Sequence, residues 1–175
     1  KSVYVSESQS NVLQLKLDSK PNNVLNINIG LNNSLLDNSN DNNIFYPSVL
    51  LINPTKKDNF CVDRIHMGLT ILGEILVSNG YAVKIIDYAF LKCLNNKIKV
   101  PRIEEVIDEF KPEVIGISVF TYLYNECQSL IDRISRCSSA SIIIGGPHFS
   151  VFPEDFFDNN KINYIVKGEA ENVIL

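Results

Sequence analysis

The feature that most constrains the fold is a strand–helix alternation that runs from residue 48 to the end of the chain. Short, continuous apolar runs alternate with longer segments in which apolar residues recur at helical spacing. The expected strands are SVLLINP (48–54), YAVKIID (81–87), EVIGISVF (113–120), SIIIGG (141–146) and NYIVKGEAE (163–171). Strands that are apolar along their whole length are typical of parallel sheets covered by helices on both faces. The sequence therefore predicts an α/β fold with a doubly wound, five-stranded parallel sheet of flavodoxin-like or Rossmann-like type, for which 2-1-3-4-5 is a common strand order.

Four helical segments should connect these strands, over residues 66–80, 101–112 and 121–137 and, as a short helix start, 153–158. The first should end at Asn79-Gly80, and Thr121 is a candidate N-cap for the third. The expected buried faces, in chain order, are Met67, Ile71, Leu72, Ile75 and Leu76; Ile103, Val106, Ile107 and Phe110; and Leu123, Cys127, Leu130, Ile131 and Ile134.

Residues 1–46 differ from the rest of the chain. The segments 11–18 and 24–31 alternate apolar and polar residues, and SKPNN between them is turn chemistry. This pattern predicts an N-terminal β-hairpin, followed by a mobile Asn-rich linker over 32–43. We therefore divide the chain into an extension, residues 1–46, and an α/β domain, residues 47–175.

Composition narrows the function. The net charge is −4 and no basic run is present, which argues against a nucleic-acid surface. Neither a signal peptide nor an apolar window of membrane-spanning length occurs, so we expect a soluble, cytoplasmic protein. The four cysteines, Cys61, Cys93, Cys127 and Cys137, form no C-x-x-C pair and are better explained as free buried thiols than as metal ligands. The start at Lys1 and the end within ENVIL suggest a piece of a longer protein.

The expected binding site is the carboxyl edge of the sheet, because ligands of doubly wound folds bind there, where the strand order reverses. The loops after the first, third and fourth strands meet at this edge. Gly145-Gly146 ends the fourth strand, and two glycines in succession favour the close approach of a ligand over a simple tight turn. His148 should point into the crevice mouth, whereas Ser118 fits a ligand contact and a strand-end cap equally well.

Nucleotide chemistry is poorly supported. The first strand is not followed by G-x-G-x-x-G or by a phosphate-binding loop, so Asp87 at the end of the second strand is only a weak candidate for a ribose-binding acid. Asp63 and His66 could pair, but no Ser or Cys stands in a nucleophile elbow. Glu169 and Glu171 in GEAE belong either to a solvated loop or to a contact with a following domain.

Taken together, VLLINP, GLTILGEILVSNGYAVKIID, IIIGGPHFSVFPEDF and YIVKGEAE resemble the N-terminal cobalamin-binding domain of cobalamin-dependent radical S-adenosylmethionine enzymes. GGPH and GEAE are the most specific elements, and the resemblance covers about residues 48–172. It implies cobalamin as the cofactor. It also implies a following radical domain with a [4Fe–4S] cluster and S-adenosylmethionine, and a methyl transfer or radical rearrangement on an unidentified small-molecule or peptide substrate.

Cobalamin-binding folds generally carry D-x-H-x-x-G, S-x-L and G-G. Ser118-Val119-Phe120 resembles the second element and Gly145-Gly146 the third, which implies that the nucleotide tail of cobalamin lies beside them with its base off cobalt. The first element departs: His66 stands three residues after Asp63 and two before Gly68. We therefore expect no catalytic residue and no metal ligand in this chain, and do not expect His66 to bind cobalt. Asp63 is the only carboxylate close to it in sequence.

The resulting cofactor-binding set comprises Pro54, Thr55, Ser118, Val119, Phe120, Thr121, Gly145, Gly146, Pro147, His148, Gly168 and Glu169. Two alternatives stay open at this point. One is a degenerate flavodoxin-like domain that has an interaction or regulatory role and no cofactor. The other is a fragment of a nucleotide-binding enzyme.

Overall fold

A computed structural model describes residues 3–7, 11–15, 46–56, 64–94, 99–152, 154–155 and 159–175. Its main sheet has five parallel strands in the order β4-β3-β5-β6-β7. The strands are β3 (Val49–Asn53), β4 (Val83–Asp87), β5 (Val114–Ser118), β6 (Ser141–Gly145) and β7 (Tyr164–Ile165). Counted along the domain, this is the order 2-1-3-4-5, and the predicted α/β class with a parallel sheet is confirmed.

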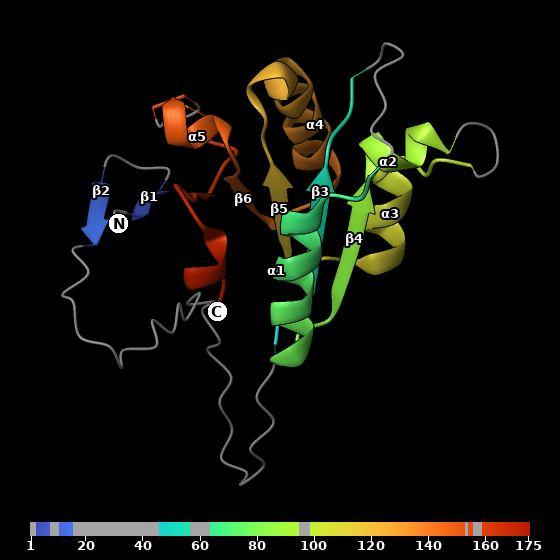
Figure 1. The fold of residues 1–175 in the computed structure, drawn as a ribbon, viewed down its shortest axis with the longest axis horizontal. Helices are drawn as coiled ribbons and strands as arrows, with labels where there is room; N and C mark the ends of the chain where they lie inside the picture. Colours follow the sequence, from blue (N-terminus) through green and yellow to red (C-terminus); the bar gives the residue numbers. More distant parts are fainter. Residues whose placement is uncertain are drawn as a thin grey trace, which may run out of the picture.

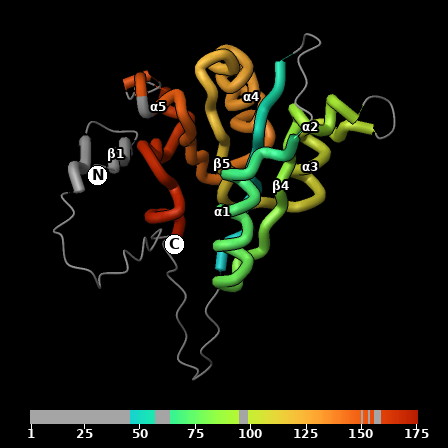
Figure 2. Tube along the Cα trace, viewed as in Figure 1, coloured from blue at the N-terminus to red at the C-terminus, as the bar shows by residue number. Residues whose placement is uncertain are grey.

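Helices cover both faces of the sheet (Figures 1 and 2). The helices are α1 (Met67–Ser78), α2 (Tyr88–Cys93), α3 (Ile103–Phe110), α4 (Tyr124–Cys137) and α5 (His148–Val151), with 3₁₀ turns η1 (Thr121–Leu123) and η2 (Ala170–Asn172). Helix α1 packs on one face, while α3 and α4 pack on the other. The chain thus passes from β3 to β4 on one side of it and then to β5 on the other side, so the strand order reverses at β3.

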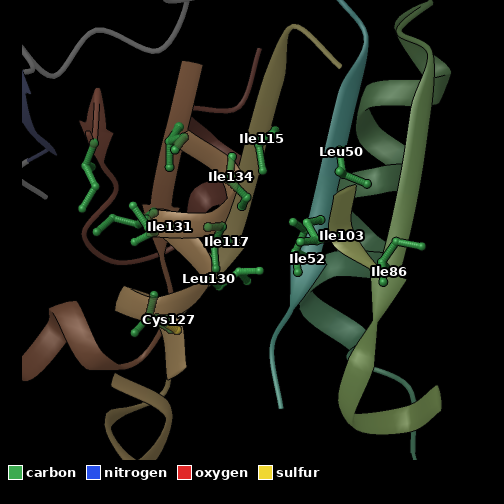
Figure 3. Packing of buried hydrophobic residues seen from close by; sticks show 14 of the residues in the cluster. Leu50, Ile52, Ile86, Ile103, Ile115, Ile117, Cys127, Leu130, Ile131 and Ile134 are labelled. Carbon is green, nitrogen blue, oxygen red and sulfur yellow. The ribbon is translucent and has the colours of Figure 1, made fainter. Parts of the chain in front are cut away.

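The two faces carry separate cores. The larger one joins Leu50 and Ile52 of β3 with Ile117 of β5 and with the predicted faces of α3 and α4 (Figure 3). Of the predicted residues on those two helices, all are buried except Phe110, which is partly buried. The smaller core lies on the α1 side and contains Val49, Leu51, Leu69, Leu76 and Val114. Alternation along the strands thus assigns residues 49, 51 and 114 to the α1 side.

The predicted buried face of α1 is partly wrong. Met67 is 61% exposed and Ile71 is 44% exposed, whereas Leu69, Gly73 and Leu76 are buried. A Cβ atom at Gly73 would lie 2.7 Å from Cδ1 of Ile85, so the helix approaches the sheet through its glycine. This close approach determines which side of an otherwise apolar helix faces the core. The predicted stop is confirmed, since Asn79 caps α1 and Gly80 has φ +90°.

Three local predictions need correction. Helix α2 was not expected from the sequence. In the structure Asp87 caps it, because its carboxylate accepts from the backbone N of Phe90 at 3.0 Å. Thr121 does not cap α4, because that helix begins at Tyr124 after the 3₁₀ turn η1. The short helix expected over 153–158 is instead α5, five residues earlier. Glu154 and Asp155 form a turn, and the rest of that segment lies outside the described residues.

Near the N-terminus, β1 (Val3–Glu7) and β2 (Asn11–Leu15) pair antiparallel. The predicted hairpin instead joined residues 11–18 to 24–31, and this second segment lies outside the described residues. In the part of the chain that the structure describes, we find no helix with the length and apolarity needed to cross a membrane.

Candidate functional site

A row of small and polar residues crosses the carboxyl edge of the sheet, formed by the last residues of four neighbouring strands. Asn53 pairs with Asp87, and Ser118 pairs with Gly145. Ile52 pairs with Ile117, which brings Asn53 beside Ser118. By strand alternation from residues 51 and 114, Asn53 and Ser118 face the α1 side. The row crosses the point where strand order reverses, between β3 and β5, which is where ligands of doubly wound folds bind.

Asp87 holds the first half of this row together. Its carboxylate accepts from Nδ2 of Asn53 at 2.8 Å and from the backbone N of His66 at 2.8 Å. It also caps α2 through the backbone N of Phe90. Because it accepts from these three donors, Asp87 fixes the positions of the loops after β3 and β4. The structure gives no support to the weaker interpretation of Asp87 as a ribose-binding acid.

His66 caps α1 and connects it to the row. Nδ1 accepts from the backbone N of Leu69 at 3.2 Å, and Nε2 lies 2.9 Å from Oγ of Ser118. Because Nδ1 accepts, the neutral ring carries its proton on Nε2 and donates it to Ser118. Burial lowers the pKa of His66, opposed in part by the nearby charge of Asp87. Both ring nitrogens are therefore engaged within the protein.

The carboxylate beside His66 is Asp87, which corrects the expectation that Asp63 is the only nearby one. Asp63 lies outside the described residues. Sequence distance was a poor guide here because the parallel pairing of β3 with β4 brings residue 87 to the loop that precedes α1.

The two glycines after β6 have different roles. Gly146 has φ +106°, and a Cβ atom there would lie 2.8 Å from N and 2.9 Å from O of Val119. Its lack of a side chain is thus explained by the close approach of the loop after β5. At Gly145, a Cβ atom would make only ordinary contacts of 3.5 Å with Val166. Gly145 is therefore the position where an added side chain could reach a ligand without first disturbing the chain.

His148 is buried, with 2% exposure, and does not open into a crevice mouth as expected. Its Nδ1 lies 3.2 Å from Oγ1 of Thr121, and its Nε2 lies 3.0 Å from Oδ2 of Asp155. Its backbone N donates to the carbonyl of Val119 at 3.1 Å. In this structure His148 links the loops after β5 and β6, so any influence on a ligand acts through those loops.

The remaining predicted residues are distributed along the same edge. Pro54 and Thr55 line a cavity of about 700 Å³ between the exit of β3, α2 and α4. Val119 is fully buried, Phe120 is partly buried with its ring 5.6 Å from that of His66, and Pro147 is exposed. Gly168 and Glu169 are exposed beyond β7 and are not part of the row.

Sequence reasoning missed Asn53. It ends the first strand of the domain at the predicted ligand edge, and it is 7% exposed. An amide side chain at the end of an apolar strand was the available signal. The Oδ1 atom of Asn53 is buried and has no hydrogen-bond partner among the described residues.

The family follows from the sequence of this domain. A model of the B12 binding domain matches residues 59–175. The chain belongs to the B12-binding domain family. No curated protein matches the chain.

Solved structures with a similar fold include two radical S-adenosylmethionine proteins. One is the radical S-adenosylmethionine methyltransferase TsrM from Kitasatospora setae, solved with cobalamin and a [4Fe–4S] cluster. It is 23% identical and superposes with a TM-score of 0.56, and the match covers 74% of this chain and 25% of TsrM. The cobalamin-dependent S-adenosylmethionine radical enzyme OxsB, solved with aqua-cobalamin, gives a TM-score of 0.56 at 25% identity, over 72% of this chain and 17% of OxsB. The chain therefore spans a quarter or less of these proteins.

The residues at the carboxyl edge fit cobalamin. The Oδ1 atom of Asn53 is an acceptor without a donor among the described residues, and cobalamin carries many amide N–H groups. Gly145, next to Ser118, has no side chain, so the edge is open there to the close approach of a ligand. Both ring nitrogens of His66 have partners within the protein, so neither is free to bind cobalt in this structure.

Proposed function

We propose that this domain binds cobalamin with its own base displaced from cobalt and without His66 as a ligand. The observation that carries the proposal is the engagement of both His66 nitrogens, by Leu69 and by Ser118, at the carboxyl edge of a B12-binding domain. A histidine that caps a helix through Nδ1 would have to break the Ser118 bond before Nε2 could bind a metal.

The chain's own residues would hold the cofactor rather than react with it. The row of Asn53, Ser118 and Gly145 would form the floor beneath the tail, and Asp87 and His148 would fix the loops around it. When bound, cobalamin supplies the cobalt chemistry for methyl transfer or radical rearrangement. We further propose that a radical S-adenosylmethionine domain with a [4Fe–4S] cluster carries out the reaction in a longer protein, in line with the similarity to TsrM and OxsB.

Binding can be tested by titrating the chain with hydroxocobalamin and recording the visible spectrum after gel filtration. We expect cobalamin to co-elute with the protein in one-to-one ratio. Elution of all cobalamin as free ligand, from a chain shown to be folded by circular dichroism, would contradict the proposal. That result would instead favour a domain that has kept the fold and lost the cofactor.

A further inference from the structure

We propose that Asn53 is a ligand-contacting residue, whose side-chain carbonyl accepts a hydrogen bond from an amide N–H or hydroxyl of the bound cofactor. This inference rests on the proposed function and adds a residue that lies outside the S-x-L and G-G elements. It concerns the middle of the edge row, between Asp87 and Ser118.

The orientation of the Asn53 amide is fixed by its neighbour. Nδ2 donates to Oδ1 of Asp87 at 2.8 Å. The reverse orientation would place the amide oxygen against a carboxylate oxygen, and two acceptors would then face each other. The side-chain carbonyl therefore points away from Asp87, and its direction does not depend on an arbitrary choice between amide N and O.

The side-chain carbonyl of Asn53 has no donor in the part of the chain that the structure describes. Asn53 is only 7% exposed, and no donor among the described residues reaches Oδ1. Buried polar atoms are nearly always paired, so a lone acceptor at this depth indicates a partner outside the described residues. Its location at the reversal of strand order is where a ligand of this fold would supply one.

The other polar groups of the row already have partners within the protein. Asp87 has three donors, and Ser118 shares its hydroxyl with Nε2 of His66. Asn53 thus combines a rigidly held amide with an open acceptor. In cobalamin, the corrin rim carries primary carboxamides, and the nucleotide tail carries a secondary amide and a ribose hydroxyl, so both parts offer the required donor.

The test compares Asn53→Ala with a matched control, Asn163→Ala. Oδ1 of Asn163 accepts from the backbone N of Ile142 at 2.8 Å, at the opposite end of β6. We expect Asn53→Ala to weaken hydroxocobalamin binding about tenfold, or about 1.4 kcal/mol, and Asn163→Ala to leave it within about twofold, whatever each does to the unfolding midpoint. If Asn53→Ala does not fold, Asn53→Leu retains the buried volume and removes the same carbonyl.

One further measurement makes the result specific. Cobinamide lacks the phosphate, ribose and base of the tail but retains the secondary amide. Weakening with both ligands therefore assigns a corrin carboxamide or the secondary amide, and weakening with cobalamin alone assigns the ribose hydroxyl. Unchanged binding by Asn53→Ala, or an equal loss in Asn163→Ala, would overturn the inference. If the parent chain binds no cobalamin, the proposed function itself fails.

Discussion

Replacing Gly146 with alanine tests whether this glycine is required by the fold rather than by a ligand. At φ +106° an L-residue is strained, which costs about 1–3 kcal/mol. The new Cβ atom would also meet N and O of Val119 at 2.8 and 2.9 Å, and backbone atoms cannot move aside as a flexible side chain can. Overpacking of this kind adds about 1–3 kcal/mol. We therefore expect Gly146→Ala to lower the free energy of unfolding by about 3 kcal/mol or more.

The neighbouring glycine supplies the control. At Gly145 an added Cβ atom would lie 3.5 Å from Val166, which is an ordinary contact, so Gly145→Ala should change the free energy of unfolding by about 1 kcal/mol or less. Urea unfolding of the cofactor-free chain, followed by circular dichroism, measures both variants on one scale. Equal stability of the two variants would refute the reasoning, because it would show that Val119 does not restrict residue 146.

Three further predictions concern titration and packing. Burial lowers the pKa of His66 in the folded chain, so the unfolded chain binds this proton more readily. The free energy of unfolding should therefore fall as the pH drops from above about 6.5 through the folded pKa. His66→Asn, which retains a capping acceptor, should show a shallower loss in pH-dependent unfolding. The guanidinium of Arg133 lowers the pKa of Glu104 to about 2. Because this ion pair is partly exposed, Glu104→Gln should lower the free energy of unfolding by only about 0.5–1 kcal/mol at pH 7. This difference from the parent chain should disappear as the pH falls from about 4.5 towards 2 in acid titrations of stability. Leu76→Ala should cost about 2–5 kcal/mol and Ile71→Ala less than about 1 kcal/mol in urea unfolding. Similar large losses in both variants would mean that α1 buries the face predicted from the sequence, which contains both residues.

The strand order was predictable because each strand carries its own signal. Continuous apolar runs such as VLLIN are typical of a sheet covered on both faces, and right-handed crossovers leave few arrangements of five such strands. The amphipathic faces of α3 and α4 were predictable for a related reason: polar residues on their outer sides leave only one choice of buried face.

Helix α1 shows where this reasoning fails. Apolar residues such as Met67, Leu69, Ile71 and Leu76 lie on several sides of this helix, so helical spacing is consistent with more than one buried face. The deciding feature is the close approach of Gly73 to Ile85, which comes from a strand that follows in sequence. Long-range packing of this kind leaves no local pattern to detect.

For the candidate site, the sequence predicted an edge of the sheet but not the contacts that the structure shows there. The carboxyl edge and Ser118 followed from the fold rule and the family resemblance. The network through Asp87 did not, because it joins Asn53, His66 and the start of α2 across two strands. Gly146 and His148 were interpreted as facing a ligand, whereas the structure shows each packed against the loop after β5.

The most direct test of the account is electron paramagnetic resonance of Co(II) cobalamin bound to the chain, because nitrogen coordinated below cobalt splits the signal and oxygen or an empty position does not. The account predicts a spectrum without nitrogen superhyperfine splitting, since the cofactor's own base is displaced and both nitrogens of His66 are engaged by Leu69 and Ser118. A clear nitrogen triplet that disappears in His66→Ala would contradict it and would make His66 the lower ligand of cobalt. A triplet that persists in His66→Ala would equally contradict it, by showing that the base of cobalamin stays on the metal.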